Sequence, residues 1–204
     1  MPVTGGSWKT VYYYFSKWSK AHVFEHAHQQ LLHFYTKRGL SSHVVVDTSF
    51  VKNVYGRDCL GKSPVDRGRR ATKVSIAVDA VGTPLQLLFH PGNKNDSRTL
   101  PHLLARLSRH TLVKGKMIFA DKGYDTSYCD ETIRSYGLQN SVSRKRSSPS
   151  KEIKRKRIVV EHCFGWLDKF RRIILRYDGL VCHFRSFNFL AACHLVGLKV
   201  GHVV

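Results

Sequence analysis

The chain has 204 residues, and its 34 Lys and Arg residues against 14 Asp and Glu residues give a formal net charge of +20. Hydrophobic residues make up 42% of the chain, which excludes a disordered basic tail and predicts one sizeable domain with a real core. So large an excess of positive charge predicts a polyanionic partner such as a nucleic acid. The five cysteines include no CxxC pair, which argues against a disulfide framework and indicates a reducing compartment.

The first 40 residues are predicted to be helical. Apolar side chains recur at helical spacing from Trp8 to about Lys20, and again from Val23 to Leu32. Aromatic stripes of this kind usually pack into a core, and the alternative is a remnant of a helix-turn-helix region that touches DNA. We therefore divide the chain into a helical segment at residues 1–40, the remnant of a DNA-binding region, and a second domain at residues 41–204.

Strand patterns begin at His43. The run His43–Lys52 is apolar and β-branched, Thr72–Ala80 alternates apolar and polar residues, and Leu85–His90 follows a turn as the partner in a hairpin. The polar, Gly-rich residues 53–70 are expected to form a loop. Asp79 lies at the hairpin turn and is expected to be structural.

Helices and short strands alternate in the second half of the chain. Three consecutive strands followed by such an alternation predict an α/β fold with a mixed sheet covered by helices. The apolar tail at residues 187–204 contains Asn and Lys, so we expect a packing helix and no membrane span. The expected elements are a helix capped by Asp96 or Ser97, a strand at Met117–Ala120, a helix capped by Thr126 or Ser127, an edge strand at Gln139–Ser143 and a helix extended to about Ile174.

Three carboxylates lie in settings that suit metal ligands. Asp47 and Asp121 each end an apolar strand, and Glu161 lies among apolar neighbours in a basic helical stretch. Carboxylates are the hard oxygen ligands that Mg²⁺ prefers, and two-metal phosphoryl transfer uses such a set together with phosphate oxygens of the substrate. The pattern predicts a magnesium-dependent enzyme acting on nucleic-acid phosphates. The structural alternatives are strand-end turns at the two aspartates and an ion pair of Glu161 with Arg157, one turn earlier.

Basic residues, most of them in the Arg144–Arg157 run or the cluster of Arg69, Arg70 and Lys73, are candidates for contacts with DNA. Lys and Arg clusters bind backbone phosphates with salt-dependent affinity and little base specificity, and the alternative is a solvated charged loop. The candidates are Arg69, Arg70, Lys73, Lys122, Arg144, Lys145, Arg146, Lys154, Arg157, Lys169, Arg171 and Arg172.

Five ordered stretches carry a resemblance to a known family. They are Asp47–Lys52, Arg69–Pro84, Pro91–Ser97, Ala120–Asp125 and Arg157–Leu167. Together they resemble the DDE transposases of bacterial insertion sequences, specifically the insertion-sequence-five group, whose relatives include Harbinger-type transposases. Five matches in order are a specific signal, whereas one alone would be weak.

The family also has a Tyr-Arg-Glu-Lys pattern around its glutamate. Arg157 matches the arginine of that pattern, Lys154 stands at the tyrosine position, and Asp168 stands at the lysine position with Lys169 beside it.

The resemblance implies an RNase H-like DDE catalytic domain at residues 41–204, with Asp47, Asp121 and Glu161 as catalytic residues and metal ligands. It implies two Mg²⁺ ions, for which Mn²⁺ can substitute, and cleavage and transfer of DNA strands at transposon ends. The implied partners are terminal inverted repeats and target DNA, a second copy of the chain on paired ends, and a separately encoded N-terminal DNA-binding protein. The implied place of action is the cytoplasm or nucleoid of a bacterium, or the nucleus for a eukaryotic or viral protein.

Two alternatives stay open from the sequence. One is a non-catalytic DNA-binding protein derived from a transposase. The other is an RNase H-like nuclease that acts on RNA–DNA hybrids.

Overall fold

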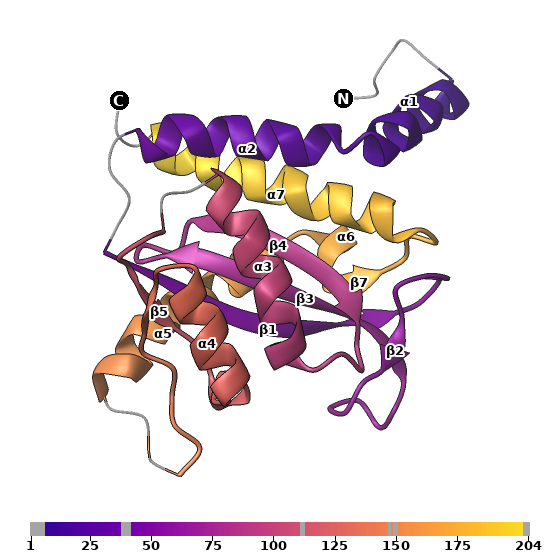
Figure 1. Ribbon diagram of the computed structural model, residues 1–204. Helices are drawn as coiled ribbons and strands as arrows, with labels where there is room; N and C mark the ends of the chain where they lie inside the picture. Colours follow the sequence, from indigo (N-terminus) through magenta and orange to yellow (C-terminus); the bar gives the residue numbers. More distant parts are fainter. Residues whose placement is uncertain (1–6, 38–41, 111–112, 147, 149–150, 202–204) are drawn as a thin grey trace.

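The computed structural model describes residues 7–37, 42–110, 113–146, 148 and 151–201. A seven-stranded mixed sheet lies at the centre, in the order β2-β3-β1-β5-β6, with β4 also paired to β3 and β7 to β1 (Figure 1). The strands are β1 (His43–Asn53), β2 (Gly61–Lys62), β3 (Arg70–Asp79), β4 (Pro84–Pro91), β5 (Met117–Phe119), β6 (Gln139–Asn140) and β7 (Leu175–Arg176). The helices are α1 (Trp8–Lys20), α2 (Val23–Thr36), α3 (Asp96–His110), the 3₁₀ helix η1 (Lys122–Tyr124), α4 (Ser127–Ser135), α5 (Lys151–Leu167), α6 (Arg171–Ile174) and α7 (Val181–Gly201).

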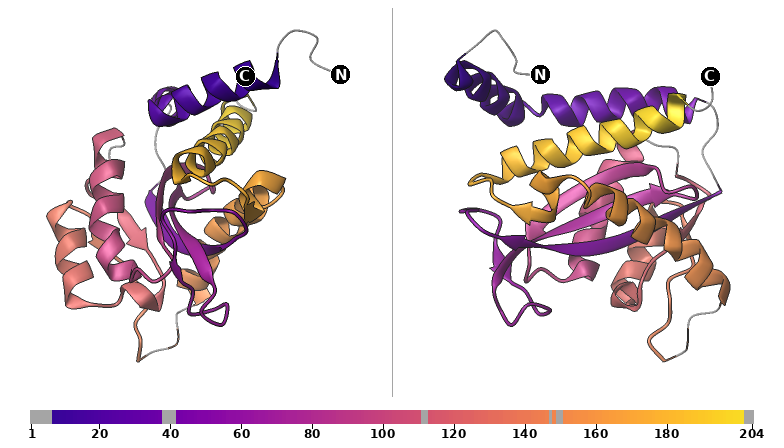
Figure 2. Two further views of the ribbon diagram at one scale, coloured as in Figure 1. Left: turned by 90° about the vertical axis from the view of Figure 1, so that its right-hand side faces the viewer. Right: turned by 180° about the vertical axis from the view of Figure 1, so that it is seen from behind.

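Strand β1 organises the sheet because it pairs with β3 on one side and β5 on the other. Its pairing with β3 is antiparallel, and its pairing with β5 is parallel, ending at Val45 opposite Phe119. Successive side chains of a strand point to opposite faces. Val44 and Val46 therefore pack with α3 and α4, whereas Val45 packs with α5 and α7. Figure 2 shows α3 and α4 on one face of the sheet and α5 on the other.

Most of the expected elements are confirmed, including both N-terminal helices, the three long strands and the helix that Thr126 caps through its Oγ1. The expected cap of α3 was wrong by one residue, because Asn95 Oδ1 accepts the Ser97 N–H at 3.0 Å. The long helix was also overextended, since α5 ends at Leu167 and the chain then forms α6 and β7. The two-residue strands β2 and β7 were not expected, because so short a strand carries no alternation.

The two N-terminal helices differ in how they pack. Helix α2 lies along α7 and contributes Leu32 to the core (Figure 1). Helix α1 touches α7 mainly through Phe15, while Trp8 is 73% exposed and Trp18 47%. The expectation that the aromatic stripe of α1 packs into the core is therefore wrong. The division between residues 40 and 41 falls at 38–41, outside the described residues, and stays a prediction.

Helix α7 is the apolar tail helix expected from the sequence, and it packs against β4 and α2. Within the described ranges, no helix is both long enough and apolar enough to cross a membrane.

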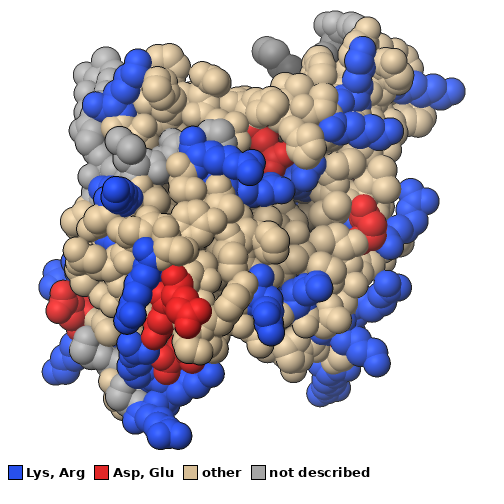
Figure 3. Space-filling view, in the orientation of Figure 1, with Lys and Arg blue, Asp and Glu red and all other residues tan. Residues whose placement is uncertain are grey.

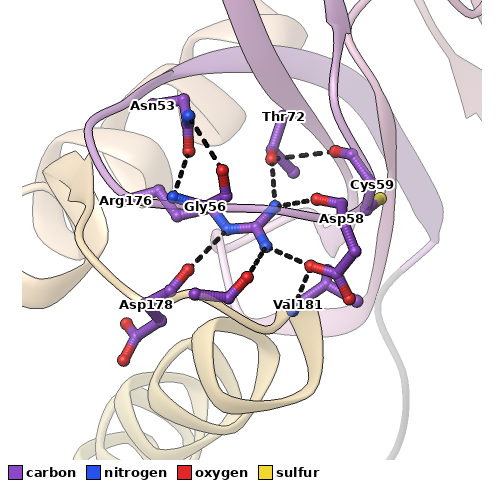
Figure 4. A network of polar contacts seen from close by, with 9 residues as sticks. Asn53, Gly56, Asp58, Cys59, Thr72, Arg176, Asp178 and Val181 are labelled. Atoms are coloured by element: carbon purple, nitrogen blue, oxygen red, sulfur yellow. Dashed lines mark hydrogen bonds and ion pairs between the residues drawn. The ribbon is translucent and has the colours of Figure 1, made fainter.

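The buried guanidinium of Arg176 on β7 links several elements at one end of the sheet (Figure 4). It donates to Thr72 Oγ1 on β3 at 2.7 Å and to the carbonyl of Asp58 at 2.8 Å. Asp58 Oδ1 in turn accepts the backbone N–H of Val181 at 2.7 Å, at the start of α7. One buried cation thus ties β3, β7, the loop before β2 and the start of α7 together.

Candidate active site

The two candidate aspartates lie side by side at the carboxyl end of β5. The parallel register ends with Val45 opposite Phe119. Two residues later, Asp47 lies within β1, which continues to Asn53, and Asp121 follows the end of β5 and caps η1. The expectation that Asp47 ends a strand was therefore wrong. Val45 and Phe119 both belong to the core on the α5 face. Because side chains two residues apart share a face, both aspartates are directed to the face that α5 covers.

Arg157 of α5 joins the two aspartates. Its Nη2 lies 3.3 Å from Asp47 Oδ2, and its Nη1 lies 3.4 Å from Asp121 Oδ1. Only 18% of its side chain is exposed, and its buried Nε has no hydrogen-bond partner in the described part of the chain. One guanidinium therefore compensates two carboxylates that would otherwise repel each other.

The local backbone orients both carboxylates. Asp47 Oδ1 accepts the N–H of Thr48 at 2.8 Å, and Asp121 Oδ1 accepts the N–H of Lys122 at 2.6 Å. Burial raises the pKa of Asp47, the bond from Thr48 and the charge of Arg157 oppose that rise, and the charge of Asp121 adds to it. A positive charge beside Asp47 therefore stabilises the ionised form of this carboxylate at neutral pH.

Glu161 lies one turn after Arg157 on α5, on the same side of the helix. It is exposed, whereas its neighbour Val160 and Cys163 are buried in the core. The expectation of an apolar setting was wrong, because apolar neighbours in the sequence fall on different faces of a helix. Glu161 has no ion pair among the described residues, and Arg157 is directed to the aspartates instead.

The donor set suits a hard cation. In the described ranges, no three His, Cys, Asp or Glu side chains are close enough together to hold a metal ion. However, the site offers adjacent carboxylate oxygens from Asp47 and Asp121, and these already bind a cationic group. Carboxylate oxygens together with substrate phosphates are the ligands that Mg²⁺ usually takes. The carboxylates of Asp47 and Asp121 therefore fit the ligand preference of a divalent ion.

Two charged residues near the site have structural partners. Asp79 accepts the N–H of Thr83 at 2.8 Å and the hydroxyl of Tyr35 at 2.6 Å, which confirms its structural role at the hairpin turn. Lys73 is buried, and its Nζ lies 2.8 Å from Asp96 Oδ1. The ammonium group of Lys73 is thus both buried and already engaged within the protein.

The other basic candidates lie at the surface, where Lys and Arg side chains far outnumber acidic ones on the face drawn in Figure 3. Arg144 pairs with Asp125 at 2.7 Å, Arg172 pairs with Asp178, and the ammonium of Lys169 stacks on Trp166. Lys122 is half-buried in η1. The candidates that are exposed and have no acidic partner among the described residues are Arg69, Arg70, Lys145, Arg146, Lys154, Lys169 and Arg171.

Comparisons with known proteins relate the chain to a family. The family model described as "Transposase DDE domain" matches residues 38–196, a range that holds all three carboxylates. The putative transposase for insertion sequence element IS402 of Burkholderia cepacia is 30% identical over 145 residues, which cover 68% of this chain and 69% of that protein. The transposase for IS1106 of Neisseria meningitidis serogroup B is 35% identical over 120 residues, which cover 53% of this chain and 40% of that protein.

A solved structure shows the fold independently of sequence similarity. The catalytic core domain of BIV integrase matches 80% of this chain and 97% of its own, with a TM-score of 0.50 and 11% sequence identity. This confirms the RNase H-like mixed sheet with flanking helices. The matches favour transposase function over a non-catalytic derivative, and the chain belongs to the family of transposases with a DDE domain.

Proposed function

We propose that the protein cleaves DNA strands at transposon ends and joins them to target DNA, with Asp47, Asp121 and Glu161 as its catalytic carboxylates. One observation carries this proposal. Two aspartates from different parts of the chain converge on one guanidinium, and that guanidinium comes from the helix that bears Glu161. Family membership implies a divalent metal and a DNA partner, and the aspartate pair is the place in the chain that suits the metal.

Each residue has a distinct task in this proposal. Asp47 and Asp121 would hold the metal, and Glu161 is free to serve as a further ligand because it is exposed and unpaired among the described residues. Two Mg²⁺ ions, or Mn²⁺ in their place, would activate the attacking oxygen and stabilise charge on the leaving oxygen. Without metal or DNA, Arg157 compensates the charge of the two aspartates. With DNA bound, the same guanidinium would contact a phosphate of the strand.

The exposed basic residues around the site would contact the sugar-phosphate backbone of the transposon's terminal inverted repeats and of the target. A homodimer on paired ends would place two such sites on one DNA complex. A separately encoded N-terminal protein would supply further recognition of the ends. The protein would act where host DNA lies, in a bacterial nucleoid or a eukaryotic nucleus.

The test is nicking of supercoiled plasmid in Mg²⁺ and in Mn²⁺ by the wild type and by Asp47→Asn and Asp121→Asn. We expect both variants to lose more than about 100-fold in rate, because changing even an outer-shell partner of a metal ligand costs about 10- to 100-fold. Glu131→Gln, an exposed carboxylate of α4, is the control and should nick normally. Persistent nicking by both aspartate variants would refute the assignment, and a preference for an RNA–DNA hybrid would identify a general nuclease instead.

A further inference from the structure

A polar cleft lies next to the short helix η1, which directly follows Asp121. It has a volume of about 710 Å³, and Gly123 of η1 forms part of its wall, two residues after Asp121. The rest of the wall comes from β2, the β2–β3 loop, β3, the β4–α3 loop, the first residue of α3 and Lys145. Its charged lining residues are Lys62, Lys73, Lys94, Asp96 and Lys145.

The charged residues of this cleft form two groups. Those on the floor are paired within the protein, and those at the rim have no acidic partner among the described residues. On the floor, Lys73 is buried and its Nζ lies 2.8 Å from Asp96 Oδ1 and 2.9 Å from the carbonyl oxygen of Lys94. The single acidic residue is therefore neutralised from inside the protein. At the rim, the side chains of Lys62, Lys94 and Lys145 are exposed and have no acidic partner among the described residues. The cleft thus presents uncompensated positive charge to solvent.

Two glycines in the wall of the cleft, Gly68 and Gly123, have open space beside their backbone. A Cβ at Gly123 would meet only Asp96 Oδ2, at 3.6 Å, and a Cβ at Gly68 would meet nothing within 4 Å. Apart from the Asp96 carboxylate in front of Gly123, no other atom fills the space within 4 Å of these two positions. A chain with a bulky charged backbone can approach closely at such positions.

The position of Lys145 is fixed relative to η1. Its backbone N–H donates to Asp125 Oδ2 at 2.8 Å, and Arg144 pairs with the other oxygen of the same carboxylate at 2.7 Å. Asp125 directly follows η1, so the segment that carries Lys145 is tied to the same short helix that follows Asp121. The rim lysine and the candidate catalytic aspartate thus keep a fixed relationship.

We propose that this cleft holds the phosphodiester backbone of the DNA strand next to the scissile phosphate, with Lys62, Lys94 and Lys145 as its phosphate contacts. The proposal rests on the proposed function, because that function places the scissile phosphate at Asp121. Lysine ammonium groups and open glycine backbone bind phosphates without reading bases, so the cleft contributes affinity and register and little sequence preference.

The first test is the salt dependence of DNA binding. Fluorescence anisotropy of a labelled duplex oligonucleotide, without divalent metal, is measured for the wild type and for the triple variant Lys62→Gln, Lys94→Gln, Lys145→Gln. Each lost phosphate contact lowers the slope of log K against log salt concentration by about 0.9. We expect a decrease of roughly 2 to 3 in the magnitude of that slope.

The control removes the same charge elsewhere, through Arg109→Gln, Lys114→Gln and Lys199→Gln, which lie on α3, before β5 and on α7. This variant should keep most of the wild-type slope. Equal slopes for the two triple variants would overturn the proposal, whether or not the wild type nicks plasmid. A reduced slope for the cleft variant alone, together with a wild type that never nicks, would overturn the proposed function and leave the contact between cleft and DNA in place.

The second test fills the cleft without changing its charge. Gly123→Leu places a side chain into the open space, and Gly197→Leu adds the same bulk at an exposed glycine of α7 where nothing lies within 4 Å. Both variants should unfold at the wild-type temperature. We expect weaker DNA binding for Gly123→Leu alone, and wild-type affinity for Gly123→Leu would overturn the proposal.

Discussion

Asp47 and Asp121 share one guanidinium, with Arg157 Nη2 at 3.3 Å from the first carboxylate and Nη1 at 3.4 Å from the second. The sheet register alone brings the two aspartates together, because β1 and β5 run parallel and in step up to Val45 and Phe119. Helix α5 then adds the cation that makes so close a carboxylate pair tolerable. The same pair is the place where a divalent metal would find its ligands.

Arg157→Gln should destabilise the protein by about 1–3 kcal/mol at neutral pH, because it leaves two facing carboxylates without their cation. The lower part of that range is expected, since the side chain of Asp121 is 53% exposed and water can resolvate it. Urea unfolding measures the loss. Arg155→Gln, an exposed residue of the same helix, should change the stability by less than about 0.5 kcal/mol.

Mg²⁺ should also raise the melting temperature of Arg157→Gln more than that of the wild type, because the ion then replaces a missing cation. An equal effect of Mg²⁺ on both proteins would show that the aspartate pair does not bind it.

Arg176→Met should cost about 3 kcal/mol of unfolding free energy, because it deletes a fully buried cation and its bonds to Thr72 and Asp58. This cost is near the lower end of the range that is typical for breaking a buried ion pair, since the side chain of Asp58 is 44% exposed. Arg70→Met, an exposed arginine of β3, is the matched control. Similar midpoints of chemical unfolding for the two variants would show that the network in Figure 4 contributes little to stability.

The stability of the protein should fall as the pH drops from about 6.5 to 4, in part through His28. Burial lowers the pKa of His28 to about 4, and its Nε2 lies 2.9 Å from the carbonyl of Pro84. The unfolded chain therefore binds a proton first. The contribution of His28 is complete above pH 6.5 and declines by up to about 3 kcal/mol on the way down to pH 4.

His28→Gln can keep a donor toward Pro84 but cannot take up a proton. Its unfolding free energy should depend less on pH across this range than that of the wild type. The remaining dependence should include His90, whose pKa burial also lowers to about 4. Identical pH profiles for variant and wild type would exclude His28 as a source of the acid sensitivity.

Sequence patterns predicted the helices and strands well where the periodicity was strong. They failed where a contact with a distant part of the chain determines the burial or the end of an element. The stripe of α1 correctly predicted a helix, but periodicity does not reveal whether a neighbour covers the stripe, and Trp8 and Trp18 are exposed. The end of α5 was missed because neither Pro nor Gly marks it. The chain turns at residues 168–170 so that Ile173 reaches the core and Leu175 pairs with Lys52.

The candidate site could be predicted as a set of residues but not as an arrangement. The apolar runs before Asp47 and Asp121 and the family resemblance made both residues candidates, and the register brings them together. The expected strand end is wrong for Asp47, because β1 continues to Asn53. Helical spacing suggested an ion pair of Arg157 with Glu161. In the structure α5 packs on the sheet so that the Arg157 side chain contacts the two aspartates instead. Lys73 illustrates the same limit, since its partner Asp96 lies 23 residues away in the sequence. Lys62 and Lys94, which line the proposed DNA cleft, were not among the predicted contacts because neither lies directly beside another basic residue in the sequence.

The most direct test of the central claim compares Glu161→Gln with Glu152→Gln in plasmid nicking with Mg²⁺ or Mn²⁺. Both residues are exposed glutamates of α5, and both changes remove one charge from the same helix. If Glu161 completes the metal site, Glu161→Gln should bind DNA as the wild type does and show no detectable nicking, while Glu152→Gln nicks normally. Nicking by Glu161→Gln at the wild-type rate would contradict the assignment of the three carboxylates as one catalytic site.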